Sequence, residues 1–201
     1  MGTKLEEIAK VAKERPKEVF TSLAHLINEE SIIECHKEME NGKAAGVDSI
    51  TKEEYAENLE QNVSELISRM KKHTYKPQPA RRTYIDKPGT NKKRPLGIAA
   101  YEDKLVQSAL AKILNAVFEQ EFLNCSFGFR PKRGCHDALS ALDKILERRP
   151  VNYIVDADIK GFFEHVDHEW MLKFIEYRIK DPNITRLITS GSLRIKLNKP
   201  V

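Results

Sequence analysis

The sequence predicts an α+β fold, in which helices make up most of the chain and a few short strands supply the rest. Apolar residues recur at helical spacing in residues 1–40, over 101–119 and over 135–148. Residues 81–98 have the composition of two extended segments around a turn, and residues 151–159 have that of a strand. Long helical patterns beside separate short strands are typical of α+β proteins.

The N-terminal region is predicted to consist of short helices. Three apolar faces follow one another there, at 5–12, 20–27 and 32–39. A turn-rich connection around Gly42 and Gly46 leads to Thr51 and Glu54, whose spacing fits a capping box. The helix that begins there is expected to bury one apolar face, made of Leu59, Val63, Leu66, Ile67 and Met70.

Residues 81–98 are predicted to form a β-hairpin with a basic tip. The run Arg81 to Lys87 is extended in character, Pro88-Gly89 is a turn signal, and Lys92 to Ile98 returns. Pro95 cannot donate to a sheet, so the returning strand is expected at an edge or a bulge.

The C-terminal half is predicted to alternate helices with strands. The helix over 101–119 carries a wide apolar stripe and belongs to the core, and the helix over 135–148 should turn its apolar face inward. A helix is expected to begin near Asp167, which is a suitable N-cap. After Asp181-Pro182 we expect a short helix and then a strand over 192–198.

The composition indicates a soluble cytoplasmic protein. The chain has 201 residues and a net charge of +4, and none of its apolar runs is long enough to cross a bilayer, so we expect no membrane partner. The N-terminus lacks the apolar core of a signal peptide. The cysteines (Cys35, Cys125 and Cys135) are odd in number, which favours free thiols in a reducing compartment, and the latter two are expected to be partly buried.

A basic strip lies between Arg69 and Arg94. It contains ten Lys or Arg residues and a single acid, Asp86, although the whole chain is only weakly basic. Tyr75, Tyr84 and several prolines are interleaved with the cations, as in surfaces that follow a nucleic-acid backbone and stack bases. The alternative is a solvated charged face.

Two carboxylates occupy one face of the strand predicted over 151–159. Asp156 and Asp158 are two residues apart, so they lie roughly 7 Å from each other on the same side and repel. A nearby cation would relieve this repulsion, and hard oxygen ligands suit Mg²⁺. The alternative is a solvated outer face of an edge strand.

The residues after Asp158 are compatible with nucleotide binding. Gly161 allows a close backbone turn whose N–H groups could hold phosphates, and Phe162 and Phe163 follow at once. The alternative for the two rings is core packing, and Trp170 is expected to pack nearby. His136, His165 and His168 provide no full metal-ligand set and are expected to pack or cap.

Four motifs together resemble the reverse transcriptases encoded by group II introns. The run Asp156-Ala-Asp158-Ile-Lys-Gly161-Phe-Phe163 is similar to their first catalytic block. The others, in the family's order, are Gly46-Val-Asp48 with the helix after it, the segment from Tyr75 to Ile98, and Ser126-Phe-Gly-Phe-Arg-Pro-Lys-Arg-Gly134. The match covers about residues 40–190. Glu164 stands where the family more often has Asp.

The resemblance implies a role for each matching residue. Asp158 would be one of three metal-binding aspartates, the backbone carbonyl of Ile159 a second ligand, and two Mg²⁺ ions would support nucleotidyl transfer. Phe163 would exclude a ribose 2′-hydroxyl. The triphosphate would be contacted by Lys87, Arg94 and the backbone N–H groups of Gly161 and Phe162.

The resemblance also implies partners and a domain division. Template or intron RNA would contact Arg81, Arg82, Arg130, Lys132 and Arg133, and a DNA primer and a deoxynucleoside triphosphate would be the other partners. Residues 1–133 would form an N-terminal extension and fingers, and residues 134–201 the beginning of a palm. The oligomeric state does not follow from the sequence.

One departure from the family bears on activity. The other two family aspartates belong to a Tyr-Ala-Asp-Asp block, which these 201 residues do not contain. We therefore expect them not to polymerise DNA by themselves. Two alternatives stay open at this point: an RNA-binding module that assists intron splicing without polymerase activity, and a reverse transcriptase of another bacterial element.

Overall fold

The computed structural model describes residues 2–86, 88, 89, 91 and 93–197, and for 163, 164 and 192–197 it describes the backbone alone. The helical elements are α1 (Gly2–Glu14), η1 (Ala24–Leu26), α2 (Glu29–Glu38), α3 (Lys52–Ala56), α4 (Leu59–Lys71), α5 (Tyr101–Phe118), α6 (Cys135–Arg148), α7 (Phe162–His165), α8 (His168–Glu176) and α9 (Pro182–Leu197). The strands β1 (Arg81–Asp86) and β2 (Lys93–Ile98) form an antiparallel pair. This content is compatible with the predicted α+β class.

The core surrounds α5. Its residues Leu105, Ala109, Ile113 and Val117 are fully buried, and α1 and α2 pack against it while α4 packs against α2. Complete burial of a Leu or Ile side chain contributes about 1.5–3 kcal/mol, so this stripe holds the helical body together. No helix in the described part of the chain is both long and apolar enough to span a membrane.

A clasp joins the N-terminal segment to the junction of α8 and α9. Phe20 pairs with Ile179 in a parallel bridge, in which Phe20 N–H donates to Arg178 O and Lys180 N–H to Phe20 O, each at 2.8 Å. The buried Arg178 donates to Glu18 O at 3.0 Å and forms an ion pair with Glu121. The clasp therefore brings residues about 160 positions apart in the sequence into direct contact.

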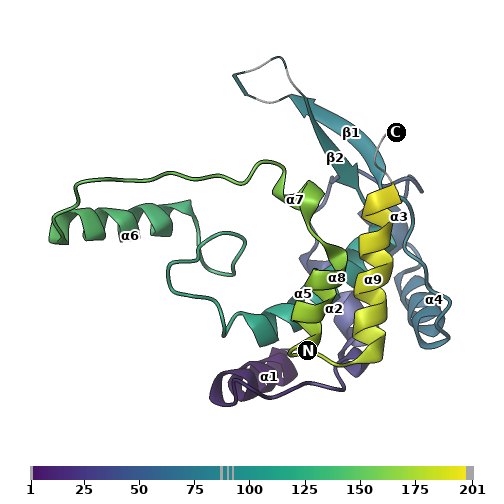
Figure 1. Cartoon of the computed structure of the whole chain (residues 1–201). Helices are drawn as coiled ribbons and strands as arrows, with labels where there is room; N and C mark the ends of the chain where they lie inside the picture. The colour runs from purple at the N-terminus through teal and green to yellow at the C-terminus, as the bar shows by residue number, and fades with distance from the viewer. Residues whose placement is uncertain (1, 87, 90, 92, 198–201) are drawn as a thin grey trace.

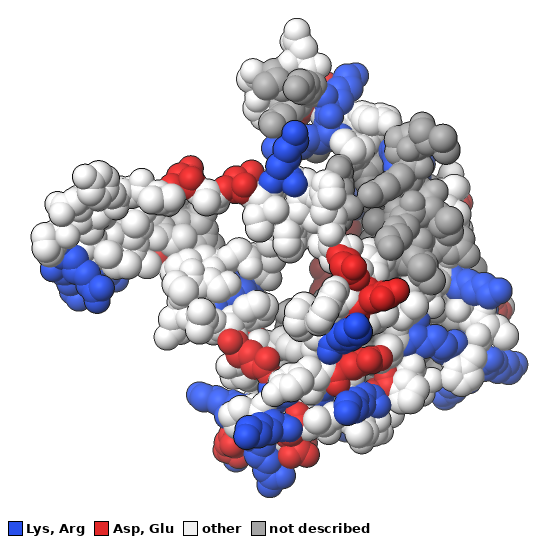
Figure 2. All heavy atoms as spheres, in the orientation of Figure 1, with Lys and Arg blue, Asp and Glu red and all other residues white. Residues whose placement is uncertain are grey.

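The figures show three parts of different shape. In Figure 1 the helices α1–α5, α8 and α9 form the body, the hairpin projects from it, and α6 stands apart on long connections. Figure 2 shows Lys and Arg side chains on the hairpin and both signs of charge mixed over the body. The hairpin is thus a basic projection on a body of mixed charge.

Several local predictions are confirmed. Thr51 and Glu54 form the capping box of α3, with Thr51 N–H donating to Glu54 Oε2 at 2.8 Å. Asp167 caps α8 by accepting from the N–H groups of Glu169 and Trp170. The hairpin forms at the predicted residues, and α5 is the predicted core helix. The apolar face at 20–27 forms only the short 3-10 helix η1.

Both predicted C-terminal strands are wrong. Residues 151–159 are neither helix nor strand, and all are exposed. A strand needs a neighbour for its N–H and C=O groups, and the described residues place none beside this segment. Residues 192–197 continue α9 instead. Asp181 and Pro182 suit the start of this helix, and the described residues pair no strand with 192–197, so the helix continues.

The predicted packing around these segments is also wrong. Helix α6 forms, but its apolar residues Leu139, Leu142 and Ile145 are exposed because none of the described elements packs against it. Trp170 lies on α8, which contacts α9, but its ring is 56% exposed beside Phe174 and does not pack in a core. Cys125 and Cys135 are exposed rather than partly buried, because they lie in the open connection before α6 and at its first residue.

Candidate nucleic-acid and nucleotide site

The segment with Asp156 and Asp158 is open to solvent on both sides. Tyr153 and Val155, which would lie opposite the two carboxylates in a strand, are 90% and 88% exposed, and Ile159 is 69% exposed. Among the described residues no three His, Cys, Asp or Glu side chains are grouped as metal ligands. The pair thus has oxygen ligands of the type that Mg²⁺ prefers, but these residues alone do not enclose an ion.

The turn predicted at Gly161 is present. Gly161 has φ 63° and ψ 36°, a left-handed conformation that glycine adopts without strain, and it begins the short helix α7. His165 Nδ1 lies 2.8 Å from Gly161 O, so the ring N–H donates back to the turn. Phe162 is 52% exposed, while Lys87 and the side chain of Phe163 lie outside the described residues.

An apolar hollow of about 530 Å³ lies beside this turn. Phe118 at the end of α5, Phe162, Met171 and Phe174 line it, together with Trp170, whose ring centroid is 5.9 Å from that of Phe174. A triphosphate needs cations and N–H donors, so this hollow does not suit it. The sequence reasoning missed the hollow because Trp170 was expected to be packed.

The register of the hairpin sorts its residues into two faces. Directly paired residues of an antiparallel ladder share a face, and successive residues alternate. One face, here called the inner face, contains Arg81, Thr83, Ile85, Arg94, Leu96 and Ile98. The outer face contains Arg82, Tyr84, Asp86, Lys93, Pro95 and Gly97. Arg81 and Arg82, predicted together as RNA contacts, therefore point in opposite directions.

The inner face is attached to the loop that carries Gly46. Arg81 donates through Nε and Nη2 to Ala45 O, at 3.0 and 2.8 Å, and Lys104 of α5 donates to Ala44 O at 2.8 Å. A Cβ on Gly46 would lie 2.5 Å from Ala100 Cα, so only glycine allows the loop to approach α5 this closely. Arg81 thus connects the hairpin to the body, and Arg94 lies farther along the same face.

A buried polar group fixes the start of the hairpin. Asp103 of α5 accepts from Tyr75 Oη at 2.6 Å and from Gln78 N–H at 2.7 Å. Burial raises the pKa of Asp103, although both hydrogen bonds oppose the rise. Burial also raises the pKa of Tyr75, as does its bond to the Asp103 carboxylate. The phenol therefore stays the donor and ties the chain before β1 to α5.

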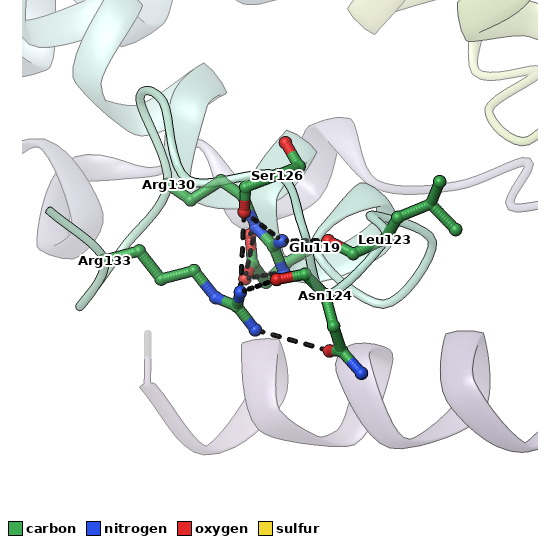
Figure 3. Close-up of polar contacts among 6 residues, drawn as sticks. All are labelled: Glu119, Leu123, Asn124, Ser126, Arg130 and Arg133. Carbon is green, nitrogen blue, oxygen red and sulfur yellow. Dashed lines mark hydrogen bonds and ion pairs between the residues drawn. The ribbon is translucent and has the colours of Figure 1, made fainter. Parts of the chain in front are cut away.

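The loop over 119–134 is organised around two arginines (Figure 3). Arg130 is 8% exposed; its Nη1 donates to Leu123 O and Ser126 O at 2.8 Å each, and its Nε and Nη2 bond the Glu119 carboxylate. These hydrogen bonds lower the pKa of Glu119. Arg133 Nη1 donates to Asn124 O at 2.8 Å.

The three cations of this loop that were predicted to contact RNA differ in how far they are bonded within the loop. All three guanidinium nitrogens of Arg130 bond within the loop, so this side chain holds the loop together in the structure. Arg133 is half-buried and Lys132 is exposed, with φ 58°. The sequence did not indicate that Arg130 bonds internally, because no local pattern distinguishes it from the neighbouring cations. Its contact with RNA remains a prediction.

Comparison with known proteins gives the family. The model described as reverse transcriptase (RNA-dependent DNA polymerase) matches residues 85–199, which is more than half of the chain. The chain belongs to the reverse transcriptase family. Its matched region begins within β1 and includes the Arg130 loop and the Asp158 segment.

One of the relatives is named as a group II intron-encoded protein, which supports the group II intron type. Group II intron-encoded protein LtrA of Lactococcus lactis subsp. cremoris is 36% identical over 185 residues, 92% of this chain and 31% of the relative. Protein YkfC of Escherichia coli K12 is 33% identical over 147 residues, 71% of this chain and 38% of that protein. Nuclear intron maturase 1, mitochondrial, of Arabidopsis thaliana is 27% identical over 93 residues, 45% of this chain and 12% of the relative. The chain thus spans about a third of the length of LtrA.

Proposed function

We propose that this chain supplies the fingers and the first part of the palm of an RNA-directed DNA polymerase. Residues 1–133 would form the N-terminal extension and fingers, and 134–201 the beginning of the palm. The observation that carries the proposal is the family match over 85–199, which contains the Asp-Ala-Asp158 block and the turn at Gly161. Template RNA, a DNA primer and a deoxynucleoside triphosphate would be the partners, in the cytoplasm.

Asp158 would be the metal ligand of this segment. Its carboxylate and the carbonyl of Ile159 are hard oxygen donors, which fits Mg²⁺. Two bound Mg²⁺ ions would supply charge stabilisation for the attacking and leaving oxygens. The part of this chain would be to present Asp158 at the end of an extended segment, directly before the backbone turns at Gly161. One such carboxylate does not complete a two-metal centre.

The nucleotide contacts would come from two places. One set would be Lys87 and Arg94, of which Arg94 lies on the inner face of the hairpin. Both would bind phosphates, and the guanidinium of Arg94 suits this because it makes planar, bidentate contacts. From the palm, the N–H groups of Gly161 and Phe162 would bind them, and Phe163 would limit the space at the sugar 2′ position. Closing the site would require the hairpin and the Asp158 segment to approach each other.

Primer extension tests the metal role of Asp158. The 201-residue chain should yield no Mg²⁺-dependent product, because a single aspartate cannot hold both ions. In the protein expressed from its complete reading frame, Asp158→Asn should abolish extension and leave RNA affinity unchanged, whereas Asp156→Asn should retain measurable extension. Full extension by Asp158→Asn would refute the assignment.

Assistance of intron splicing is a second candidate function. It is favoured by the similarity to a nuclear intron maturase and by the basic hairpin, and it needs no metal site. Reversing the charge of both Arg81 and Arg82 should weaken intron RNA binding and reduce its salt dependence, because fewer counterions are released. Unchanged binding would mean that the hairpin cations are only a solvated face.

A further inference from the structure

We propose that the outer face of the hairpin binds single-stranded RNA, with an unpaired base stacked on Tyr84 and phosphates held by Arg82 and Lys93. The proposal rests on the proposed function and deepens it. Arg94, the candidate triphosphate contact among the described residues of the hairpin, lies on the inner face. The proposed RNA contacts lie on the opposite, outer face.

The two faces differ in how much the body covers them. On the inner face Thr83 and Ile98 are half-buried, and Arg81 is bonded to the Gly46 loop. On the outer face every residue is exposed, including Tyr84 at 56%. The side chains of Arg82 and Lys93 have no hydrogen-bond or ion-pair partner among the described residues, so their donors are available to a ligand.

The cross-strand neighbours leave the outer face flat. Gly97 is opposite Arg82 and has no side chain, and Pro95 is opposite Tyr84 and presents a small rigid ring. Arg82 and Tyr84 are two residues apart on one strand, roughly 7 Å along it. A cation beside an accessible aromatic ring is the pairing that surfaces for single-stranded nucleic acid use.

The charges of the outer face favour a polyanion. Arg82 and Lys93 are positive, and Asp86, opposite Lys93 near the tip, is the single acid of this face. Asp86 reduces the attraction at the tip, so phosphate contact should be strongest near the base of the hairpin, at Arg82. Pro95 lacks an N–H and lies on an exposed strand, which opposes addition of a further β-strand there. A nucleic acid fits this face better than a peptide strand.

The test measures binding of an oligouridylate of about 16 nucleotides that carries one 2-aminopurine, using the 201-residue chain. Arg82→Ala should weaken binding and reduce the salt slope by about 0.7, the value for one phosphate contact on a single strand. Tyr84→Leu should weaken binding about tenfold, leave the salt slope unchanged and abolish quenching of 2-aminopurine. Tyr84→Phe should retain the quenching, because the ring is kept.

Two variants serve as controls, and melting curves verify that every variant is folded. Leu96→Ala removes an exposed apolar side chain from the inner face of the same hairpin, and Lys37→Ala removes an exposed cation from α2. Both should bind like the unmodified protein. Equal losses for Leu96→Ala and Tyr84→Leu would overturn the face assignment.

The remaining outcomes separate this inference from the proposed function. Salt-dependent RNA binding that Tyr84→Leu leaves intact would overturn the stacking site and leave the proposed function standing. Failure of the unmodified chain to bind RNA would overturn both the stacking site and the RNA contacts of the proposed function.

Discussion

Replacing Asp181 by alanine should lower the free energy of unfolding by more than the loss of a helix N-cap alone would. The carboxylate caps α9 by accepting from the N–H groups of Asn183 at 2.9 Å and Ile184 at 3.4 Å. Its other oxygen accepts from the N–H groups of Leu23 at 2.6 Å and Ala24 at 2.8 Å, which lie about 158 residues earlier. One side chain therefore holds both a helix end and the clasp.

The magnitude follows from these two roles. Losing an N-cap costs about 1 kcal/mol. Leu23 is 2% exposed, so its orphaned N–H would cost about 1–3 kcal/mol more. We expect a loss of about 2–4 kcal/mol for Asp181→Ala. Asp167→Ala is the matched control, because Asp167 caps α8 at an exposed site by accepting from the N–H groups of Glu169 and Trp170, and the loss of such a cap costs about 1 kcal/mol.

The pH dependence gives a second check. Burial pushes the pKa of Asp181 upward, but the four backbone N–H donors outweigh it, and the pKa is lowered overall. A lowered pKa in the folded state means that the stabilisation is complete above the unfolded value of about 3.9 and is lost as the pH falls through the folded value. The difference between unmodified protein and Asp181→Ala should shrink in strongly acidic solution.

Urea denaturation followed by circular dichroism measures these free energies near pH 7 and in a series of lower pH values. Two results would refute the reasoning. One is a loss for Asp181→Ala that does not exceed the loss for Asp167→Ala near neutral pH. The other is a loss for Asp181→Ala that grows as the pH falls.

Three further substitutions test other parts of the structure. Tyr75→Phe should cost about 1–3 kcal/mol near pH 7, because it removes a donor from the buried Asp103 carboxylate, and the loss measured by denaturation should be smaller in acid, where that carboxyl is protonated. Gly46→Ala should lower the melting temperature, at a cost of about 1–3 kcal/mol or more, because its Cβ would meet the backbone of Ala99 and Ala100 just before α5. The control Gly128→Ala, whose Cβ would meet nothing within 4 Å, should leave the melting temperature unchanged. Arg130→Met should make the loop over 119–134 sensitive to chymotrypsin, because the carbonyls and carboxylate that the arginine holds are released.

Local signals in the sequence were sufficient to predict most of the helices and the hairpin. The capping box at Thr51, the N-cap at Asp167 and the stripe of α5 each depend on residues within a few positions of one another. The hairpin is also local, since its strands are joined by a short turn. Such features form from the same interactions in almost any surrounding, so sequence reasoning predicts them well.

Long-range contacts were not predictable in this way. The clasp joins Arg178 and Asp181 to residues near 20, and only an Asp-Pro pair marks the position in the sequence. Likewise the family resemblance implied an RNA contact for Arg130, whereas the structure shows that this guanidinium bonds the loop itself. A motif in the sequence identifies a cation but not whether internal partners already occupy it.

The candidate metal segment differs from the hairpin in what determines its shape. The hairpin contains both of its strands, so each backbone N–H of the ladder has its partner within a few residues. The segment around Asp158 contains one strand-like sequence, and the described residues offer no second strand, so it stays extended and exposed. Its residue types are those that the proposed metal site requires, but the described residues do not by themselves fix its geometry. The basic hairpin is therefore the part of the proposed site that the described residues shape by themselves. We accordingly expect RNA binding, rather than metal binding, to be measurable with the 201-residue chain.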